Sequence, residues 1–236
     1  MIALSPPETA RVWARRSRKS SSWLELARFH GALTGVLLWG AAVNFIIAFT
    51  LGGVASSLPL LAVVGAYAAL AWGGGRLMLS SKCPLVSFVG VSLAACPLGL
   101  TLQRALGAEG EELVMQVVFA MGLFVCAQGL LALALARLER PALVLWSGVA
   151  AGVALNALFA LSFDTFSLLH WLILLVMQGR AALYWSKATA LAKTADNAVD
   201  VAGALVVDSV NPLYYAHCAQ ELWGARAKGR GRGRRG

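Results

Sequence analysis

The chain has 236 residues, of which 59% are hydrophobic and only 13% are charged, and its net charge is +9 at pH 7. A soluble domain of this length needs far more polar surface, since about 25% of the residues in an average globular protein are charged. The composition therefore excludes a soluble enzyme, a secreted disulfide scaffold and a disordered chain, and it predicts an integral membrane protein.

Residues 1–28 form a predicted basic arm whose only acids are Glu8 and Glu25. Because the arm is rich in arginine and serine, it has features of an organellar presequence, and we expect the mitochondrial inner membrane. Its charge suits contact with anionic lipid headgroups, and an acidic partner subunit is the alternative; nucleic acid is not an expected partner. The residues that we expect to make such contacts are Arg15, Arg16 and Arg18.

Residues 29–224 are predicted to form a transmembrane domain, because they contain seven apolar windows of about 20 residues, the length that spans hydrocarbon as a helix. The windows lie at 30–51, 54–74, 83–103, 113–136, 141–163, 165–185 and 199–220. The separators are short, such as Gly52-Gly53, so neighbouring helices should run antiparallel. Backbone groups find no water in lipid, which favours helices. The expected fold is all-α, a seven-span helical bundle.

Small residues predict how these helices pack. Gly31/Gly35 and Gly148/Gly152 are small-xxx-small pairs, which let two helix backbones approach closely within a membrane. Gly73-Gly74-Gly75 is interpreted as a helix end or a flexible join, because it lacks the strand and the Lys-Ser/Thr of a phosphate loop.

The basic residues of the separators predict the orientation, because they collect on the inner side of a membrane. For six crossings the alternation is consistent and places the amino terminus on the cytosolic or matrix side. The seventh window breaks it, since a full crossing of 199–220 puts the basic tail on the other side and a re-entrant segment does not. We expect a full crossing. The Gly/Arg-rich tail, 225–236, should have no fold of its own, and its expected headgroup or partner contacts are Arg230, Arg232 and Arg234.

Asp208 is the acid that lies in the middle of an apolar window. Such a carboxylate is costly unless it is protonated, paired or facing water, which makes it a candidate for an ion pathway or gate. Asn211 lies on the same helical face, and Pro212 frees a backbone carbonyl, so these oxygens could ligate a hard cation. In the alternative interpretation, Asp208 pairs with Arg180 and locks the bundle.

No catalytic motif is present, so we do not expect an enzyme. A haem between His170 and His217 is conceivable, but no second histidine pair exists, and hydrogen bonds to loop carbonyls are the preferred interpretation for these residues. We therefore expect no cofactor.

The stretch ALVVDSVNPLYYAHCAQELWG, 204–224, resembles the closing segment of the Bax inhibitor-like family of seven-span membrane proteins. Its Asp208, its Asn211 three residues later and its Gly224 occupy the family's positions. The stretches VSFVGVSLAACPLGLTL and VMQVVFAMGLFVCAQGLLALA also look similar to the family's helices.

This resemblance implies a passive calcium leak whose opening is set by protonation of two aspartates on the last two helices. Asp208 matches one of them. The other should lie near Tyr184 or Trp185 in LYWSK, where the chain has no acid, and Pro212 stands where the family has an apolar residue. The alternative function is a non-catalytic accessory subunit of a larger organellar membrane complex.

Overall fold

A computed structural model describes residues 12, 21–106, 111–138, 140–162 and 168–210. The seven α-helices in these ranges are α2 (Trp23–Ser57), α3 (Leu60–Ser80), α4 (Pro84–Leu106), α5 (Glu111–Leu135), α6 (Pro141–Ser162), α7 (Leu168–Ala188) and α8 (Ala195–Val210). A short 3₁₀ turn, η1 (Ala136–Leu138), joins α5 to α6. The described part of the chain is almost entirely helical and contains no strand, which confirms the all-α prediction.

Within the described ranges, four helices are long and apolar enough to cross a membrane. They are Trp23–Leu51, Leu61–Ser80, Met115–Leu135 and Pro141–Ser162, and Pro84–Cys96 is a shorter apolar stretch. Large apolar side chains on these helices face outward, for example Leu61 and Leu161, which are 85% and 87% exposed. An apolar outer surface of this kind is stable in contact with lipid, so the fold fits a multi-pass integral membrane protein.

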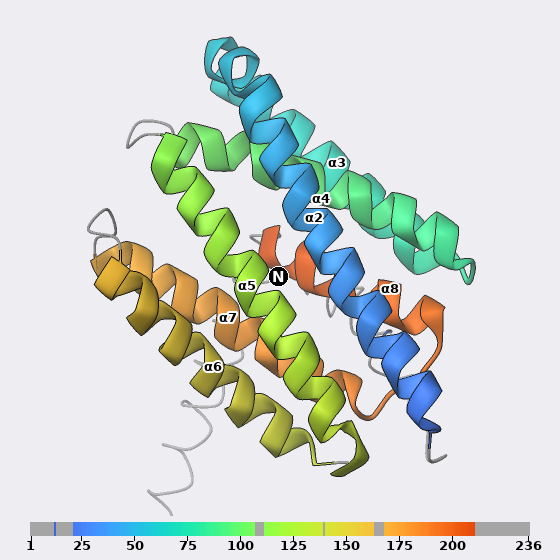
Figure 1. The fold of residues 1–236 in the computed structure, drawn as a ribbon. Coiled ribbons are helices and arrows are strands. Elements are labelled where there is room, and N and C mark those ends of the chain that lie inside the picture. Colours follow the sequence, from blue (N-terminus) through green and yellow to red (C-terminus); the bar gives the residue numbers. More distant parts are fainter. Residues whose placement is uncertain (1–11, 13–20, 107–110, 139, 163–167, 211–236) are drawn as a thin grey trace, which may run out of the picture.

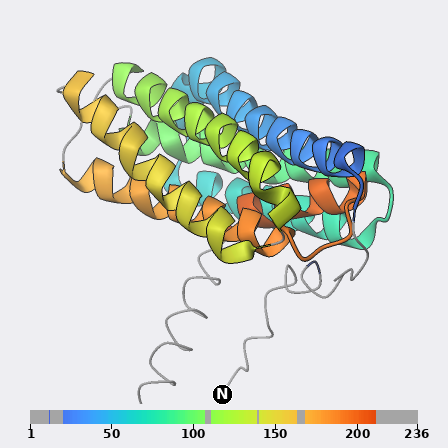
Figure 2. The ribbon, with the colours of Figure 1, turned by 60° about the horizontal axis from the view of Figure 1, so that its bottom comes forward.

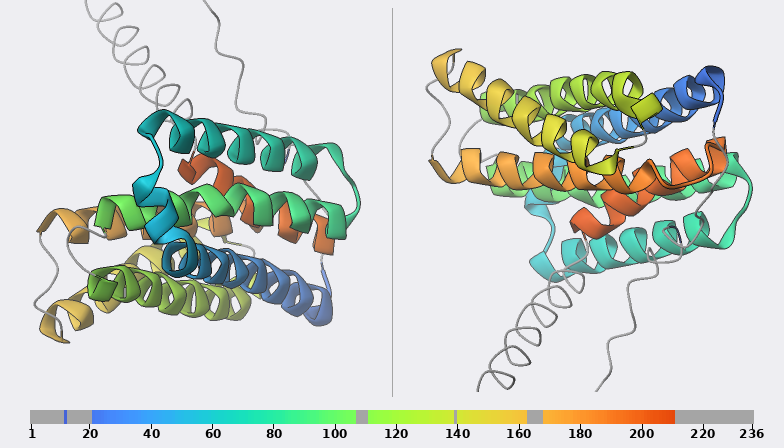
Figure 3. Two further views of the ribbon diagram at one scale, coloured as in Figure 1. Left: turned by 90° about the horizontal axis from the view of Figure 1, so that it is seen from above. Right: turned by 90° about the horizontal axis from the view of Figure 1, so that it is seen from below.

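The helices form layers (Figure 3). In these views α2, α5 and α6 lie in one layer, α4 and α7 in the next, and α3 on the outer side of α4. The start of α2, the α3–α4 turn, the α5–α6 connection and the α7–α8 turn lie toward the same end of the bundle (Figures 1 and 2). Helix α8 packs against α4, α2, α3 and α7, so it is enclosed by its neighbours.

Helix α2 begins with a capping box. The Ser22 backbone N–H donates to Glu25 Oε2 (2.7 Å), and the Glu25 N–H donates to Ser22 Oγ (3.3 Å). The helix continues through Gly52-Gly53, so the prediction that these glycines separate two helices is wrong. It ends at Leu58-Pro59, because the residue before a proline is pushed out of the helical region, and Leu58 is extended with ψ 146°.

Helices α3 and α4 make direct backbone contact at two glycines. A Cβ added at Gly74 would lie 2.5 Å from the carbonyl oxygen of Gly90, and one at Gly90 would lie 2.6 Å from the N of Met78. The Gly73-Gly74-Gly75 stretch is therefore inside α3, with Gly74 at the contact with α4, which corrects the prediction of a helix end or a flexible join there. The hydroxyl of Ser87 adds a buried hydrogen bond to the Met78 carbonyl (3.2 Å).

The two predicted small-xxx-small pairs have different positions. Gly148 and Gly152 are buried, and a Cβ at either would contact a glutamine of a neighbouring helix, so this pair lies at a close helix–helix contact as predicted. Gly31 and Gly35 are exposed, and a Cβ at either would meet nothing within 4 Å. Among the described residues that pair joins no two helices, and the prediction is wrong for it.

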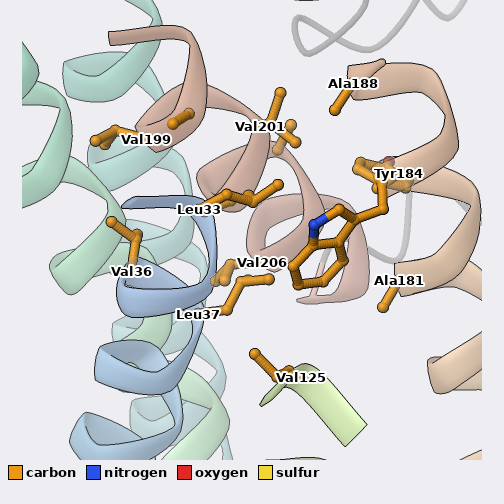
Figure 4. Close-up of a cluster of buried hydrophobic side chains, with 14 of the residues drawn as sticks. Leu33, Val36, Leu37, Val125, Ala181, Tyr184, Ala188, Val199, Val201 and Val206 are labelled. Carbon is orange, nitrogen blue, oxygen red and sulfur yellow. The ribbon is translucent and has the colours of Figure 1, made fainter. Parts of the chain in front are cut away.

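The main core lies around α8 (Figure 4). The side chains that meet there come from α2, α5, α7 and α8. They are Leu33, Val36, Leu37, Val125, Ala181, Tyr184, Ala188, Val199, Val201 and Val206. The helix starts at Ala195, one turn before the predicted window 199–220, and the part of that window beyond Val210 lies outside the described residues.

Candidate functional site

Helix α8 carries a carboxylic acid into the core. All residues from Asn197 to Ala204 are buried, so this helix has no lipid-facing or water-facing side there. Asp200 lies within this stretch and is 0% exposed. Since an ionised carboxylate in an apolar interior is stable only when hydrogen bonds or charges compensate it, a fully enclosed aspartate is a functional candidate.

Lys193 caps the C-terminal end of α7, just before the helix that carries this acid. Its ammonium donates to the carbonyl oxygens of Ala188 (2.8 Å), Thr189 (2.8 Å) and Leu191 (2.9 Å). The last carbonyls of a helix have no partner within the helix, and a lysine has three donors, so Lys193 caps α7. The positive charge also suits the negative end of the helix dipole.

The start of α8 is tied to the same turn. The N–H of Asn197 donates to Thr194 Oγ1 (3.2 Å), and the Asn197 side-chain amide donates to the Ala192 carbonyl (2.8 Å). Asp196 stands in the first helical turn, where a negative charge is favourable. The turn from Thr189 to Thr194 is therefore held by side chains from its own residues and from α8.

Helix α2 contributes a buried histidine to this end of the bundle. His30 is 1% exposed, and neither ring nitrogen has a hydrogen-bond partner among the described residues. The ammonium of Lys193 lies 4.9 Å from the centre of the ring of Phe29, the residue before His30. No sequence motif predicts this arrangement, because it is formed by residues that are far apart in the chain.

A second buried polar group joins α5, α6 and α7. Asn156 and Gln178 exchange two amide hydrogen bonds (3.0 and 3.3 Å). Gln128 donates to the Val144 carbonyl (3.2 Å), and its side-chain oxygen packs against Gly148. Polar side chains in apolar helices commonly stabilise helix–helix contacts, so this set explains how α6 is held to its neighbours.

The predicted site is only partly within the described structure. Asp208 lies on α8, but its side chain lies outside the described residues, as does the whole of Asn211. Arg180 lies on α7, is partly buried and has an interaction partner, and whether that partner is Asp208 lies outside the described part. The predicted arm and tail contacts also lie outside it. They are Arg15, Arg16, Arg18, Arg230, Arg232 and Arg234, and the same holds for the side chain of His170 and for His217.

Asp200 was missed for an identifiable reason. The predicted window began at residue 199, which placed Asp200 at a span end and left Asp208 as the acid deep in an apolar segment. The structure starts α8 at Ala195 and surrounds it with other helices, so Asp200 is interior. The run DNAVDVAGA, in which Asp196 and Asp200 are four residues apart among small apolar residues, was the available signal.

At the position where the resemblance implies a second acid, the chain has aromatic side chains that pack in the core. Tyr184 and Trp185 are 2% and 0% exposed and belong to the main core cluster. The indole N–H of Trp185 is buried with no hydrogen-bond partner among the described residues. An indole only donates, so it can neither ligate a cation nor take up a proton in place of a carboxylate.

Among the described residues, no group of three or more His, Cys, Asp and Glu side chains could hold a metal ion. No protein-family model, curated protein or solved structure matches the chain.

Proposed function

We propose that the protein is a seven-span membrane protein of the Bax inhibitor-like type that lets a hard cation, calcium by that resemblance, cross the bilayer passively along α8. Asp208 and Asn211 belong to the pathway, as the sequence predicts, and Asp200 joins them. No bond is made or broken in this function, so the protein is not an enzyme. The observation that carries the proposal is the complete enclosure of Asp200 in a bundle whose outer surface is apolar.

Burial of the Asp200 carboxyl group is costly. Several kcal/mol are lost when a carboxyl group is moved from water into an apolar interior, whereas an alanine at the same place would cost nothing. Carboxylate and amide oxygens are the ligands that calcium prefers. Asp200 and Asp208 both stand on α8, eight residues or about 12 Å apart along its axis. Two acids at two positions along one helix, which is enclosed from Asn197 to Ala204, are suited to successive cation positions.

In this proposal α8 alone supplies the acids, because Tyr184 and Trp185 are not acidic and their helix has no Asp or Glu from Leu168 to Ala188. Opening therefore requires a rearrangement of α8 against its neighbours rather than the separation of two facing aspartates. The enclosed state of Asp200 corresponds to the closed pathway.

Calcium flux into indicator-loaded liposomes tests the proposal. Asp200→Asn and Asp208→Asn should each lower the flux at least about tenfold, the effect of losing roughly 1.4 kcal/mol of stabilisation at a cation position. Glu112→Gln is the matched control, because Glu112 is exposed on α5 and an amide oxygen can still accept from Gln116 Nε2 (3.2 Å). Flux that both aspartate variants leave unchanged would overturn the assignment of α8 as the pathway.

The proposal includes a topology in the mitochondrial inner membrane, with the amino terminus on the matrix side and 199–220 crossing fully. Tags at the two ends should then lie on opposite sides of the membrane. In intact vesicles a protease should cleave one tag and not the other, and in permeabilised vesicles it should cleave both. Tags found on one side would show that the last segment is re-entrant and does not cross.

A second candidate function is that of a non-catalytic accessory subunit. It is favoured by the exposed side of α2, where Gly31 and Gly35 have open space, and by an adjoining groove of about 420 Å³ between α2 and α5. The groove is lined by Leu38, Ala41, Ala42, Phe45, Ile46, Val118, Phe119, Gly122, Leu123 and Cys126. The mass of the purified particle in detergent decides this: a monomer without co-purifying proteins contradicts the subunit function.

A further inference from the structure

Exposed basic side chains gather at one end of the bundle, called here the basic end. It is the end where α2 begins and where the α3–α4 turn, the α5–α6 connection and the α7–α8 turn lie (Figures 1 and 2). Its exposed acid among the described side chains is Glu25, which accepts from the Ser22 N–H. At the other end, the described side chains include exposed Glu112 but no exposed cation. The exposed cations of the basic end are Arg28, Arg76, Lys82, Arg140 and Lys187.

Exposed tryptophans show where this end meets lipid. Trp23, Trp72 and Trp146 are exposed, and each lies within about three turns of the basic end of its helix. Arg76 and Arg140 stand closer to that end than Trp72 and Trp146 do. Because tryptophan is enriched at the headgroup level of a bilayer, the cations just beyond it lie where lipid phosphates are. The surroundings of these cations therefore favour a lipid headgroup over a water-soluble anion.

Two of the cations come from distant parts of the chain and are held near each other. The hydroxyl of Ser186, in the last turn of α7, donates to the carbonyl oxygen of Pro141, the first residue of α6 (2.8 Å). Arg140 precedes Pro141 and Lys187 follows Ser186, so their Cα atoms are at most about 15 Å apart. Both side chains are exposed, and two long basic side chains can meet one phosphate group across this distance.

The backbone of this pair belongs to two helix ends rather than to a long loop. The Arg140 carbonyl accepts from the N–H groups of Leu143 (3.0 Å) and Val144 (3.4 Å), which starts α6. Lys187 stands in the last turn of α7, and its ammonium lies 5.6 Å from the centre of the Tyr184 ring. Because the helices fix both positions, little order has to be gained when an anion binds between them.

We propose that Arg140 and Lys187 bind the phosphodiester group of an anionic phospholipid where α6 begins and α7 ends. A guanidinium forms two parallel hydrogen bonds to a phosphate, and an ammonium adds a second charge with donors of its own. Basic pockets between membrane helices hold headgroups of this kind. The site is separate from the contacts expected for the terminal arms, and it is independent of the cation pathway because no ion has to cross.

Native mass spectrometry of the full chain in detergent tests the site, with phosphatidylglycerol and phosphatidylcholine of identical acyl chains as probes. The unaltered protein should bind phosphatidylglycerol more tightly. Arg140→Gln and Lys187→Gln should each weaken that binding about fivefold, and the double variant about 25-fold, with phosphatidylcholine binding unchanged.

The matched control is the double variant Arg76→Gln/Lys82→Gln. It removes the same charge at the same end, but from α3 and the turn after it, and α3 lies on the opposite side of the bundle from α6 (Figure 3). Since charges beyond a Debye length of about 8 Å are largely screened, this variant should weaken phosphatidylglycerol binding less than about threefold.

Equal losses in the two double variants would show a diffuse basic surface and would overturn the site. Phosphatidylglycerol that binds no more tightly than phosphatidylcholine would also overturn it, as would displacement of the bound lipid by an excess of inorganic phosphate. If the Arg140/Lys187 double variant does not fold, the single variants decide, and unchanged binding in either of them contradicts the proposal.

Discussion

Asn156 on α6 and Gln178 on α7 face each other across two helices and exchange two hydrogen bonds, of 3.0 and 3.3 Å, with both side chains buried. Removal of one partner leaves the other amide unsatisfied inside the bundle. We expect Asn156→Ala to lower the free energy of unfolding by about 1 kcal/mol, within the range seen for hydrogen bonds between membrane helices. Thermal unfolding in a fixed detergent measures this.

The pair also predicts non-additivity. When Asn156 and Gln178 are both replaced by leucine, no buried amide remains, so the double variant should lose less stability than the sum of the single variants. Additive losses would show that the two amides act independently and that the mutual hydrogen bonds contribute nothing.

Gly90 should tolerate no side chain. Its Cβ would lie 2.6 to 3.0 Å from backbone atoms of Gly74 and Met78, and a backbone cannot rotate away as a side chain does. Gly90→Ala should therefore separate α3 from α4 and cost about 1–3 kcal/mol or more. Gly31→Ala is the control, because its Cβ meets nothing within 4 Å and alanine favours the helix by up to about 1 kcal/mol. Equal effects of the two changes on unfolding temperature would contradict the α3–α4 contact.

Two substitutions of Trp185 distinguish the loss of packing from the loss of a hydrogen bond. Its side chain is 0% exposed and its Nε1 has no hydrogen-bond partner among the described residues. Trp185→Phe should therefore cost about 1 kcal/mol, since it removes volume without breaking a polar contact, whereas Trp185→Ala should cost about 3–5 kcal/mol. A large loss in the phenylalanine variant would mean that the indole N–H has a partner, such as a buried water.

Loss of the capping box should affect only the start of α2. Ser22→Ala removes the acceptor of the Glu25 N–H and should cost about 1 kcal/mol. Because the box is exposed, we expect faster hydrogen exchange in the first turn of α2 and no change in α5 or α6. Ser21→Ala, one residue before the box, is the control and should change neither.

The sequence alone determined the helical architecture and several element positions. The predicted windows 83–103, 113–136 and 141–163 lie within three residues of α4, α5 and α6, because apolar length and helix-breaking residues are local properties of the chain. The contact at Gly148 and Gly152 could also be predicted, since two glycines four residues apart expose the backbone of one helix face.

Tertiary structure decided which residues become interior. Gly31 and Gly35 have the same spacing as the other glycine pair but lie on an exposed side of α2, and local sequence does not specify which side a neighbour covers. Likewise, Asp200 stands near the start of its helix and Lys193 in a turn, and both would be accessible to water if α8 were an outer helix. Asp200 becomes a buried acid only because α2, α3, α4 and α7 surround α8, whereas Lys193 bonds to carbonyls of its own turn. Burial depends on contacts between distant segments, which no short stretch of sequence contains.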